Sequence, residues 1–209
     1  MDAAGSLAAF DRARSGAGRL VLAGVDEAGR GCWAGPVVAA AVVLPPGWCP
    51  EGLDDSKRLT ARCRERLCAE IRTGALAWGA CAVSAGEIDA TDILQATLRA
   101  MARAVARLRL RPDLVLVDGN RPPVLALPCE CLVRGDGTSA AVAAASVLAK
   151  VFRDRVMTAW DRHHPGYGFA AHKGYGAAAH REALQRLGPC PLHRLSYRPL
   201  ALLDQGRLF

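Results

Sequence analysis

The sequence is poor in aromatic residues, with four phenylalanines, four tryptophans and three tyrosines among 209 residues. Alanine is abundant instead, so we expect a core built from small aliphatic side chains. No apolar stretch is long enough and free enough of charge to cross a bilayer. The first 18 residues contain Asp2 and Asp11 and lack the apolar segment of a signal peptide. These absences predict a cytoplasmic protein without a membrane partner.

Paired cysteine motifs of the kind that hold structural zinc are also lacking. Eight cysteines are present, but Cys129-x-Cys131 and Cys190-x-x-His193 each stand without a second pair at zinc-site spacing. We therefore expect reduced thiols that are buried as small apolar groups. A zinc-stabilised interaction domain is the alternative, and metal analysis of the purified protein would reveal it.

Acidic residues are outnumbered by basic ones, 20 to 27, which gives a formal net charge of +7. A basic surface favours anionic partners, most often nucleic acid. A solvated basic surface without a specific partner fits the charge alone equally well. The length suits one domain with a sizeable core.

Apolar runs and turn residues predict five strands and four main helices. The strands are expected at 19–26, 36–44, 76–83, 113–120 and 129–133, and the helices at about 60–72, 87–109, 138–161 and 176–187. Short turns join the early strands and helices link the later ones. We predict an α/β fold with a mixed five-stranded sheet, flanking helices and a C-terminal helical segment. Residues 1–18 are predicted to be a flexible arm.

Acidic side chains stand at the ends of two predicted strands. Asp26 and Glu27 end the first, and Asp118 ends the fourth. If these strands are neighbours, the carboxylates converge and repel one another unless a divalent cation binds. Two such ions, about 3.5–4 Å apart, can activate water and stabilise the leaving oxygen of a phosphodiester. The set predicts a metal-dependent nuclease, although any one of these acids alone is more typical of an exposed turn.

The turn Gly29-Arg30-Gly31 follows the first acidic pair after a single residue, Ala28. Glycines allow the backbone to approach a ligand and expose its N–H groups. An arginine between them suits a phosphate. The turn therefore predicts sugar-phosphate contacts beside the metal site.

Seven longer motifs occur in order over about residues 20–200. They are GVDEAGRG (24–31), AGPVVAAAVVL (34–44), DDSKRLT (54–60), ILQATLRAM (93–101), LVDGN (116–120), RGDGTSAAVAAASVLAKVFRD (134–154) and HKGYG (172–176). Together they resemble the bacterial type of the ribonuclease HII, or type 2 ribonuclease H, family. The resemblance implies a ribonuclease H-like fold for a catalytic domain over 19–200. It also implies hydrolysis of the RNA strand in RNA–DNA hybrids.

The family's chemistry includes a cut on the 5′ side of a single ribonucleotide in duplex DNA, which leaves a 3′-hydroxyl and a 5′-phosphate. Such cuts begin ribonucleotide excision repair. The matching motifs imply that four acids are catalytic and bind two Mn²⁺ or Mg²⁺ ions: Asp26, Glu27, Asp118 and Asp136.

Substrate contacts are also implied by the matching motifs. Gly29-Arg30-Gly31 would contact the sugar that bears the 2′-hydroxyl, the group that distinguishes RNA from DNA. Tyr175 would stack on the neighbouring deoxyribose, with Tyr167 as the competing candidate. The candidate phosphate contacts are Lys57, Arg121, Arg134, Lys150, His172 and Lys173. Asp154 is expected to be a structural partner of a basic neighbour.

Two positions depart from the family's pattern. Cys32 stands where proline is usual, and Trp33 replaces a smaller aliphatic residue. We expect a less rigid turn at this point, with an effect on fine selectivity for the RNA–DNA junction.

The end of the sequence carries one more motif. Gln205, Leu208 and Phe209 resemble the short peptides that bind the bacterial sliding clamp, so residues 201–209 are a candidate clamp-binding tail. A frayed terminus is the alternative. We otherwise expect a monomer whose partners are RNA–DNA hybrids and ribonucleotide-containing duplexes.

Two further functions compete with this interpretation. Another metal-dependent nuclease of the same fold would keep the carboxylates without needing the GRG and HKGYG motifs. A non-catalytic nucleic-acid-binding module has no need for clustered acids, which repel phosphate. Cleavage of a duplex with one embedded ribonucleotide, against an all-DNA control, separates these possibilities.

Overall fold

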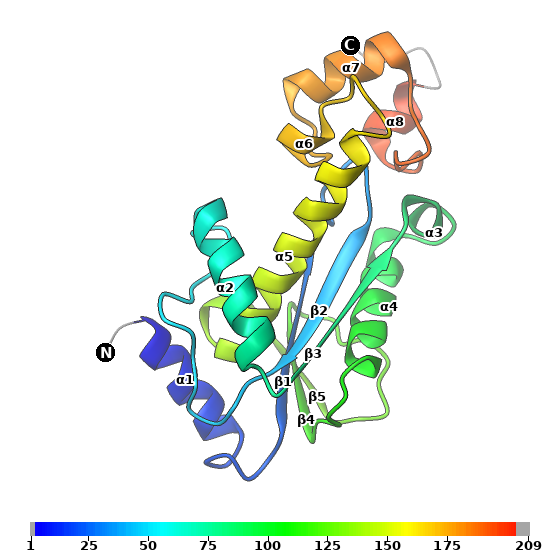
Figure 1. The fold of residues 1–209 in the computed structure, drawn as a ribbon. Helices are drawn as coiled ribbons and strands as arrows, with labels where there is room; N and C mark the ends of the chain where they lie inside the picture. The colour runs from blue at the N-terminus through cyan, green and yellow to red at the C-terminus, as the bar shows by residue number, and fades with distance from the viewer. Residues whose placement is uncertain (1–2, 204–209) are drawn as a thin grey trace.

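The computed structural model describes residues 3–203, and it is built around a five-stranded sheet in the order β3-β2-β1-β4-β5 (Figure 1). The strands are β1 (Leu22–Ala28), β2 (Val37–Val43), β3 (Ala77–Val83), β4 (Leu114–Asp118) and β5 (Cys129–Leu132). Strands β1, β2 and β3 pair antiparallel, whereas β4 runs parallel to both β1 and β5. The predicted mixed sheet is confirmed.

Helices cover both faces of the sheet. They are α1 (Ala3–Arg14), α2 (Ala61–Gly74), α3 (Ala85–Asp89), α4 (Ile93–Ala106), α5 (Ala140–Asp161), α6 (Phe169–His172), α7 (Ala178–Leu187) and α8 (Arg198–Leu203), with a 3-10 turn at Gly135–Gly137. Helix α5 packs on β1 and β2 and is itself contacted by α1 and α2, while α4 packs on β2 and β3. In Figure 1, α5 runs past the edge of the sheet toward α6, α7 and α8, which gather at its far end.

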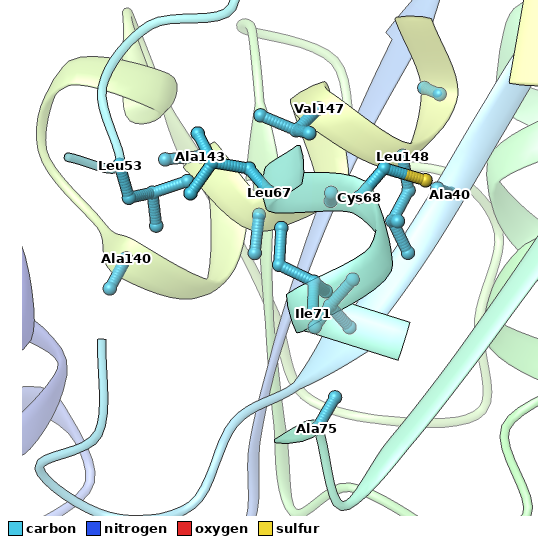
Figure 2. Close-up of a cluster of buried hydrophobic side chains, with 14 of the residues drawn as sticks. Ala40, Leu53, Leu67, Cys68, Ile71, Ala75, Ala140, Ala143, Val147 and Leu148 are labelled. Carbon is cyan, nitrogen blue, oxygen red and sulfur yellow. The ribbon is translucent and has the colours of Figure 1, made fainter. Parts of the chain in front are cut away.

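Small side chains bring α5 very close to the sheet. The helix carries a run of buried alanines from Ala140 to Ala149. A Cβ atom placed on Gly24 of β1 would lie 2.1 Å from the backbone carbon of Ala141. Figure 2 shows the layer above, where Leu67, Cys68 and Ile71 of α2 pack toward α5. The expected core of small aliphatic residues is confirmed on this face.

The N-terminal segment differs from the expected flexible arm. Residues 3–14 form α1, which places Leu7 in the core beside α2 and α5. The Asp11 carboxylate accepts the N–H group of Ala141 at 2.8 Å, at the start of α5. The composition of the segment suggested a loose chain, but these tertiary contacts order it.

The helix predicted over 87–109 is two helices. Ser84 caps α3 by accepting the N–H of Glu87, and Asp92 caps α4 by accepting the N–H of Gln95 at 2.8 Å. The second cap restarts the helix in a new direction. Helix α8, in the basic tail, was not predicted. The clamp-like residues Gln205, Leu208 and Phe209 lie outside the described residues.

Across residues 3–203, every helix is too short or too polar to serve as a membrane span.

Candidate metal centre

The first strand and the fourth bring their acids to one edge of the sheet. Strands β1 and β4 are parallel neighbours, and their last paired residues are Val25 and Val117. The next residue on each strand is an acid, Asp26 on β1 and Asp118 on β4. Because side chains alternate along a strand, both point to the α5 face, as Gly24 does, whereas Glu27 points to the α4 face. The condition under which the sequence predicts converging carboxylates, that these strands are neighbours, is therefore fulfilled.

Hydrogen bonds hold the two aspartates in place. Asp26 is buried, accepts the N–H of Glu27 at 2.6 Å and is hydrogen-bonded to the Ser146 hydroxyl of α5. Asp118 accepts the N–H of Gly135 at 2.7 Å. This second bond ties the turn that carries Asp136 to the end of β4.

Three of these acids have raised pKa values. The pKa of Asp26 lies well above its usual value, first because the group is buried and then because Glu27 and Asp118 repel its charge. Burial also raises the pKa of Glu27, with Asp118 adding to the rise. The pKa of Asp136 is raised by burial, by Asp55 and by Asp118. Four carboxylates that repel one another form a donor set that suits a hard divalent cation.

The four acids do not form a closed cage: Glu27 and Asp118 line one small hollow, and Asp136 lines a neighbouring one. In the described part of the chain, no three acidic, histidine or cysteine side chains are placed closely enough to hold an ion as they stand. An ion would draw the carboxylates toward a common point. Basic groups lie close by: Arg30 is 3.4 Å from the Glu27 carboxylate, and the Lys57 ammonium is 3.4 Å from that of Asp136.

The structure distinguishes the two candidate tyrosines. Tyr175 is 43% exposed, and its ring lies 5.6 Å from the Lys150 ammonium and 5.7 Å from the Arg153 guanidinium. Tyr167 is only 8% exposed, stacks on Phe169 and donates its hydroxyl to the Gly188 carbonyl at 2.7 Å. Only Tyr175 presents a ring to an approaching ligand.

Several candidate phosphate contacts have structural partners instead. The Lys173 ammonium donates to the Thr158 hydroxyl of α5 and to the Ala170 carbonyl of α6. The His172 ring bonds to the Tyr167 carbonyl and to the N–H of Gly174. Neither side chain lies at the acids. Asp154 pairs with Lys150 at 2.8 Å, as expected of a structural partner.

Two remaining candidates lie beside the acids. Arg121 shares a small pocket with Glu27 and Asp118, and Arg134 lines a larger hollow together with Lys57 and Asp136. These two arginines and Lys57 therefore surround the carboxylates with positive charge. Such a rim attracts a phosphate backbone toward acids that would otherwise repel it.

Sequence reasoning missed several polar residues that support the centre. The Ser56 hydroxyl lies 2.8 Å from that of Ser146, which in turn contacts Asp26. Arg153 and Arg194 are fully buried beneath the GRG turn. Arg153 occupies a position within the apolar pattern of α5, and this position could have indicated a buried arginine. The sequence gives no such signal for Arg194, which lies in a loop.

A mixed sheet with acids at the ends of two parallel strands, and a basic glycine turn beside them, defines the class of ribonuclease H-like nucleases. The chain belongs to the ribonuclease HII family: the family model described as Ribonuclease HII matches residues 23–199. Family membership makes it an endonuclease of the ribonuclease H type that acts on RNA–DNA hybrids.

Known proteins agree with this assignment. The chain is 56% identical over 189 residues to Ribonuclease HII of Syntrophotalea carbinolica, covering 90% of each. It is 58% identical over 180 residues to Ribonuclease HII 2 of Methylibium petroleiphilum, covering 86% of this chain and 83% of the relative.

Solved structures share the fold. Ribonuclease H2 of Pyrococcus horikoshii superposes with a TM-score of 0.75 at 24% identity, over 88% of this chain and 97% of that one. Ribonuclease HII of Archaeoglobus fulgidus, solved in a complex with PCNA, gives 0.70 at 28% identity, over 86% and 96%. The predicted ribonuclease H-like fold is confirmed.

Proposed function

We propose that this enzyme also cuts on the 5′ side of single ribonucleotides embedded in duplex DNA, as in ribonucleotide excision repair, leaving a 3′-hydroxyl and a 5′-phosphate. The observation that carries the proposal is the position of the GRG turn. It begins where β1 ends, two residues after Glu27, so a sugar held at the turn would place its phosphate at the carboxylates.

Asp26, Glu27, Asp118 and Asp136 are the proposed ligands of two Mn²⁺ or Mg²⁺ ions. Their mutual repulsion supports this role, because bound cations would remove it. When bound, such ions supply an activated water and stabilise the departing 3′-oxygen. Bst-RNase HIII, which shares the fold with a TM-score of 0.74, was solved in complex with Mn²⁺.

The chain's own residues bind and orient the substrate in this proposal. Arg30 and Lys57 form ion pairs with Glu27 and Asp136. In this proposal they also neutralise substrate phosphates on either side of the acids. The backbone N–H groups of the turn meet the 2′-hydroxyl, and Tyr175 stacks on the next sugar. Ser146 and the N–H of Gly135 keep Asp26 and Asp118 oriented.

Cleavage of a duplex with one central ribonucleotide tests the proposal. We expect one cut, on the 5′ side of the ribonucleotide, with Mg²⁺ or Mn²⁺ and none with a chelator. An all-DNA duplex of the same sequence is the control. Cleavage of continuous hybrids alone, with the single ribonucleotide left intact, would contradict it.

We further propose that Gln205, Leu208 and Phe209 bind a sliding clamp. The support is the motif itself, together with the Archaeoglobus relative, which was solved in a complex with PCNA. Removal of residues 205–209 leaves α8 and the catalytic domain intact, so cleavage of a short duplex should not change while clamp binding is lost. Unchanged binding to the clamp would end this idea. A monomeric state and a cytoplasmic location remain predictions.

A further inference from the structure

A buried cation lies directly beneath the GRG turn. Arg194 is fully buried and forms no ion pair with any residue among 3–203. All its donors meet neutral oxygens. Nε and Nη2 bond to the Gly35 carbonyl at 3.0 and 2.9 Å, and Nη2 also to that of Gly29 at 2.7 Å. Nη1 donates to the Arg30 carbonyl and to the Tyr197 hydroxyl, both at 2.8 Å.

Stability alone is a poor reason for this arrangement. A buried charge without a counterion is costly, and an apolar side chain of similar volume is often at least as stabilising. What Arg194 supplies in particular is a rigid, planar set of five donors. Those donors fix three carbonyl groups within one short loop, at residues 29, 30 and 35. A lysine would keep the charge without this geometry.

The direction of the carbonyls determines the direction of the N–H groups. In a trans peptide the C=O and the N–H point opposite ways. When Arg194 draws the carbonyls of Gly29 and Arg30 inward, the N–H groups of Arg30 and Gly31 turn outward. Neither N–H forms a hydrogen bond with another of the described residues. The turn therefore presents two free donors beside Glu27.

Tyr197 strengthens the same arrangement from the C-terminal side. Its hydroxyl donates to the Arg30 carbonyl at 2.5 Å, and the Arg194 guanidinium lies 5.1 Å from the centre of its ring. The carbonyl of Arg30 thus receives two donors from a segment more than 160 residues away in the chain. These bonds fix the carbonyl side of the turn, while the effect of Cys32 on its rigidity stays a prediction.

We propose that Arg194, assisted by Tyr197, is a positioning residue for ribose recognition, because it aims the N–H groups of Arg30 and Gly31 at the 2′-hydroxyl. The inference rests on the proposed function of the turn. Arg194 does not touch the substrate and acts only through the backbone above it. Loss of the guanidinium group should therefore lower the rate of cleavage at a ribonucleotide without lowering the affinity for DNA.

The experiment compares Arg194→Lys and Tyr197→Phe with the wild-type protein. The matched control is Arg186→Lys, because Arg186 is an exposed arginine of α7 that donates to the carbonyl of Gly166. Two quantities are measured with Mn²⁺: the single-turnover rate on a duplex with one ribonucleotide, and the affinity for the same duplex made entirely of DNA. Circular dichroism establishes a temperature at which every variant is folded.

We expect Arg194→Lys to lower the cleavage rate by about a hundredfold, since small misplacements of a positioned group have effects of this size. Tyr197→Phe should lower it by a smaller factor, about threefold to tenfold, through the loss of one hydrogen bond to a carbonyl. Affinity for the all-DNA duplex should change by less than about twofold in both variants, and the control should match the wild type.

Other outcomes overturn the inference. An unchanged cleavage rate in Arg194→Lys would show that the guanidinium fork is not needed. Equal losses of cleavage and of DNA affinity would show a general structural role. If Arg194→Lys does not fold, the cleavage rate and the DNA affinity of Tyr197→Phe test the inference in its place. A wild-type protein that leaves every single ribonucleotide uncut would refute the proposed function instead, which makes the two failures distinguishable.

Discussion

Acidification from pH 7 to pH 5 should destabilise the C-terminal helices through a buried histidine pair. The Nε2 atoms of His180 and His193 lie 3.0 Å apart. The Nδ1 atom of His180 faces the Tyr175 carbonyl at 2.9 Å and so carries a proton. Nδ1 of His193 accepts the N–H of Cys190 at 2.9 Å, the shorter of its two contacts, and lies 3.2 Å from the Cys190 carbonyl oxygen. Two neutral rings satisfy this network, and an added proton would break it.

The size of the effect follows from the pKa values. Burial lowers the pKa of each histidine from 6.5 to about 4. The unfolded chain therefore takes up these protons below pH 6.5, whereas the folded chain does so only near pH 4. Stability is lost as the pH falls through this window. Between pH 7 and pH 5 the loss is about 2 kcal/mol for each histidine.

Urea unfolding of the wild type and of His193→Gln, each at pH 7 and at pH 5, measures this loss. Several buried or half-buried acids have raised pKa values and stabilise the folded state as the pH falls, which opposes the histidines: Asp11, Asp26, Glu27 and Asp136. The difference between the two proteins cancels that contribution. The wild type should lose about 2 kcal/mol more than the variant, and equal losses would refute the reasoning.

Three other changes have defined outcomes. Arg30→Ala should reduce the salt dependence of duplex binding by about one phosphate contact, and an unchanged slope in a salt titration would exclude that contact. Gly24→Ala should lower the free energy of unfolding by about 3 kcal/mol, because the new Cβ would lie 2.1 Å from the Ala141 backbone; chemical denaturation would show no loss if α5 can move away. Leu67→Ala should cost about 2–5 kcal/mol in the same measurement, since Leu67 is fully buried.

The strands of the sheet could be predicted because buried strands consist of apolar residues, which are visible in the sequence. Strands β1, β2 and β4 are buried on both faces and read as continuous apolar runs. The acids that interrupt these runs, Asp26 and Asp118, could be placed at strand ends for the same reason. The pairing of β1 with β4 depends on the tertiary structure, so the sequence alone could not establish it.

The errors have physical causes as well. Helix α1 was missed because its order depends on contacts of Leu7 and Asp11 with distant segments rather than on local propensity. Arg194 was missed because its partners are backbone carbonyls near residue 30, and no side chain marks them in the sequence. Two tyrosines with similar surroundings in sequence, Tyr167 and Tyr175, could be separated only by their exposure.

We propose that the acids at the ends of β1 and β4 would hold the divalent ions that cleavage requires. Single-turnover cleavage by Asp118→Asn tests it most directly. The control is Asp113→Asn, because Asp113 lies just before the other end of β4 and accepts the N–H of Val21 at 2.9 Å. We predict that Asp118→Asn still binds the duplex but cuts at least about 10³-fold more slowly, while Asp113→Asn cuts normally. A near wild-type rate for Asp118→Asn with Mg²⁺ would contradict the claim.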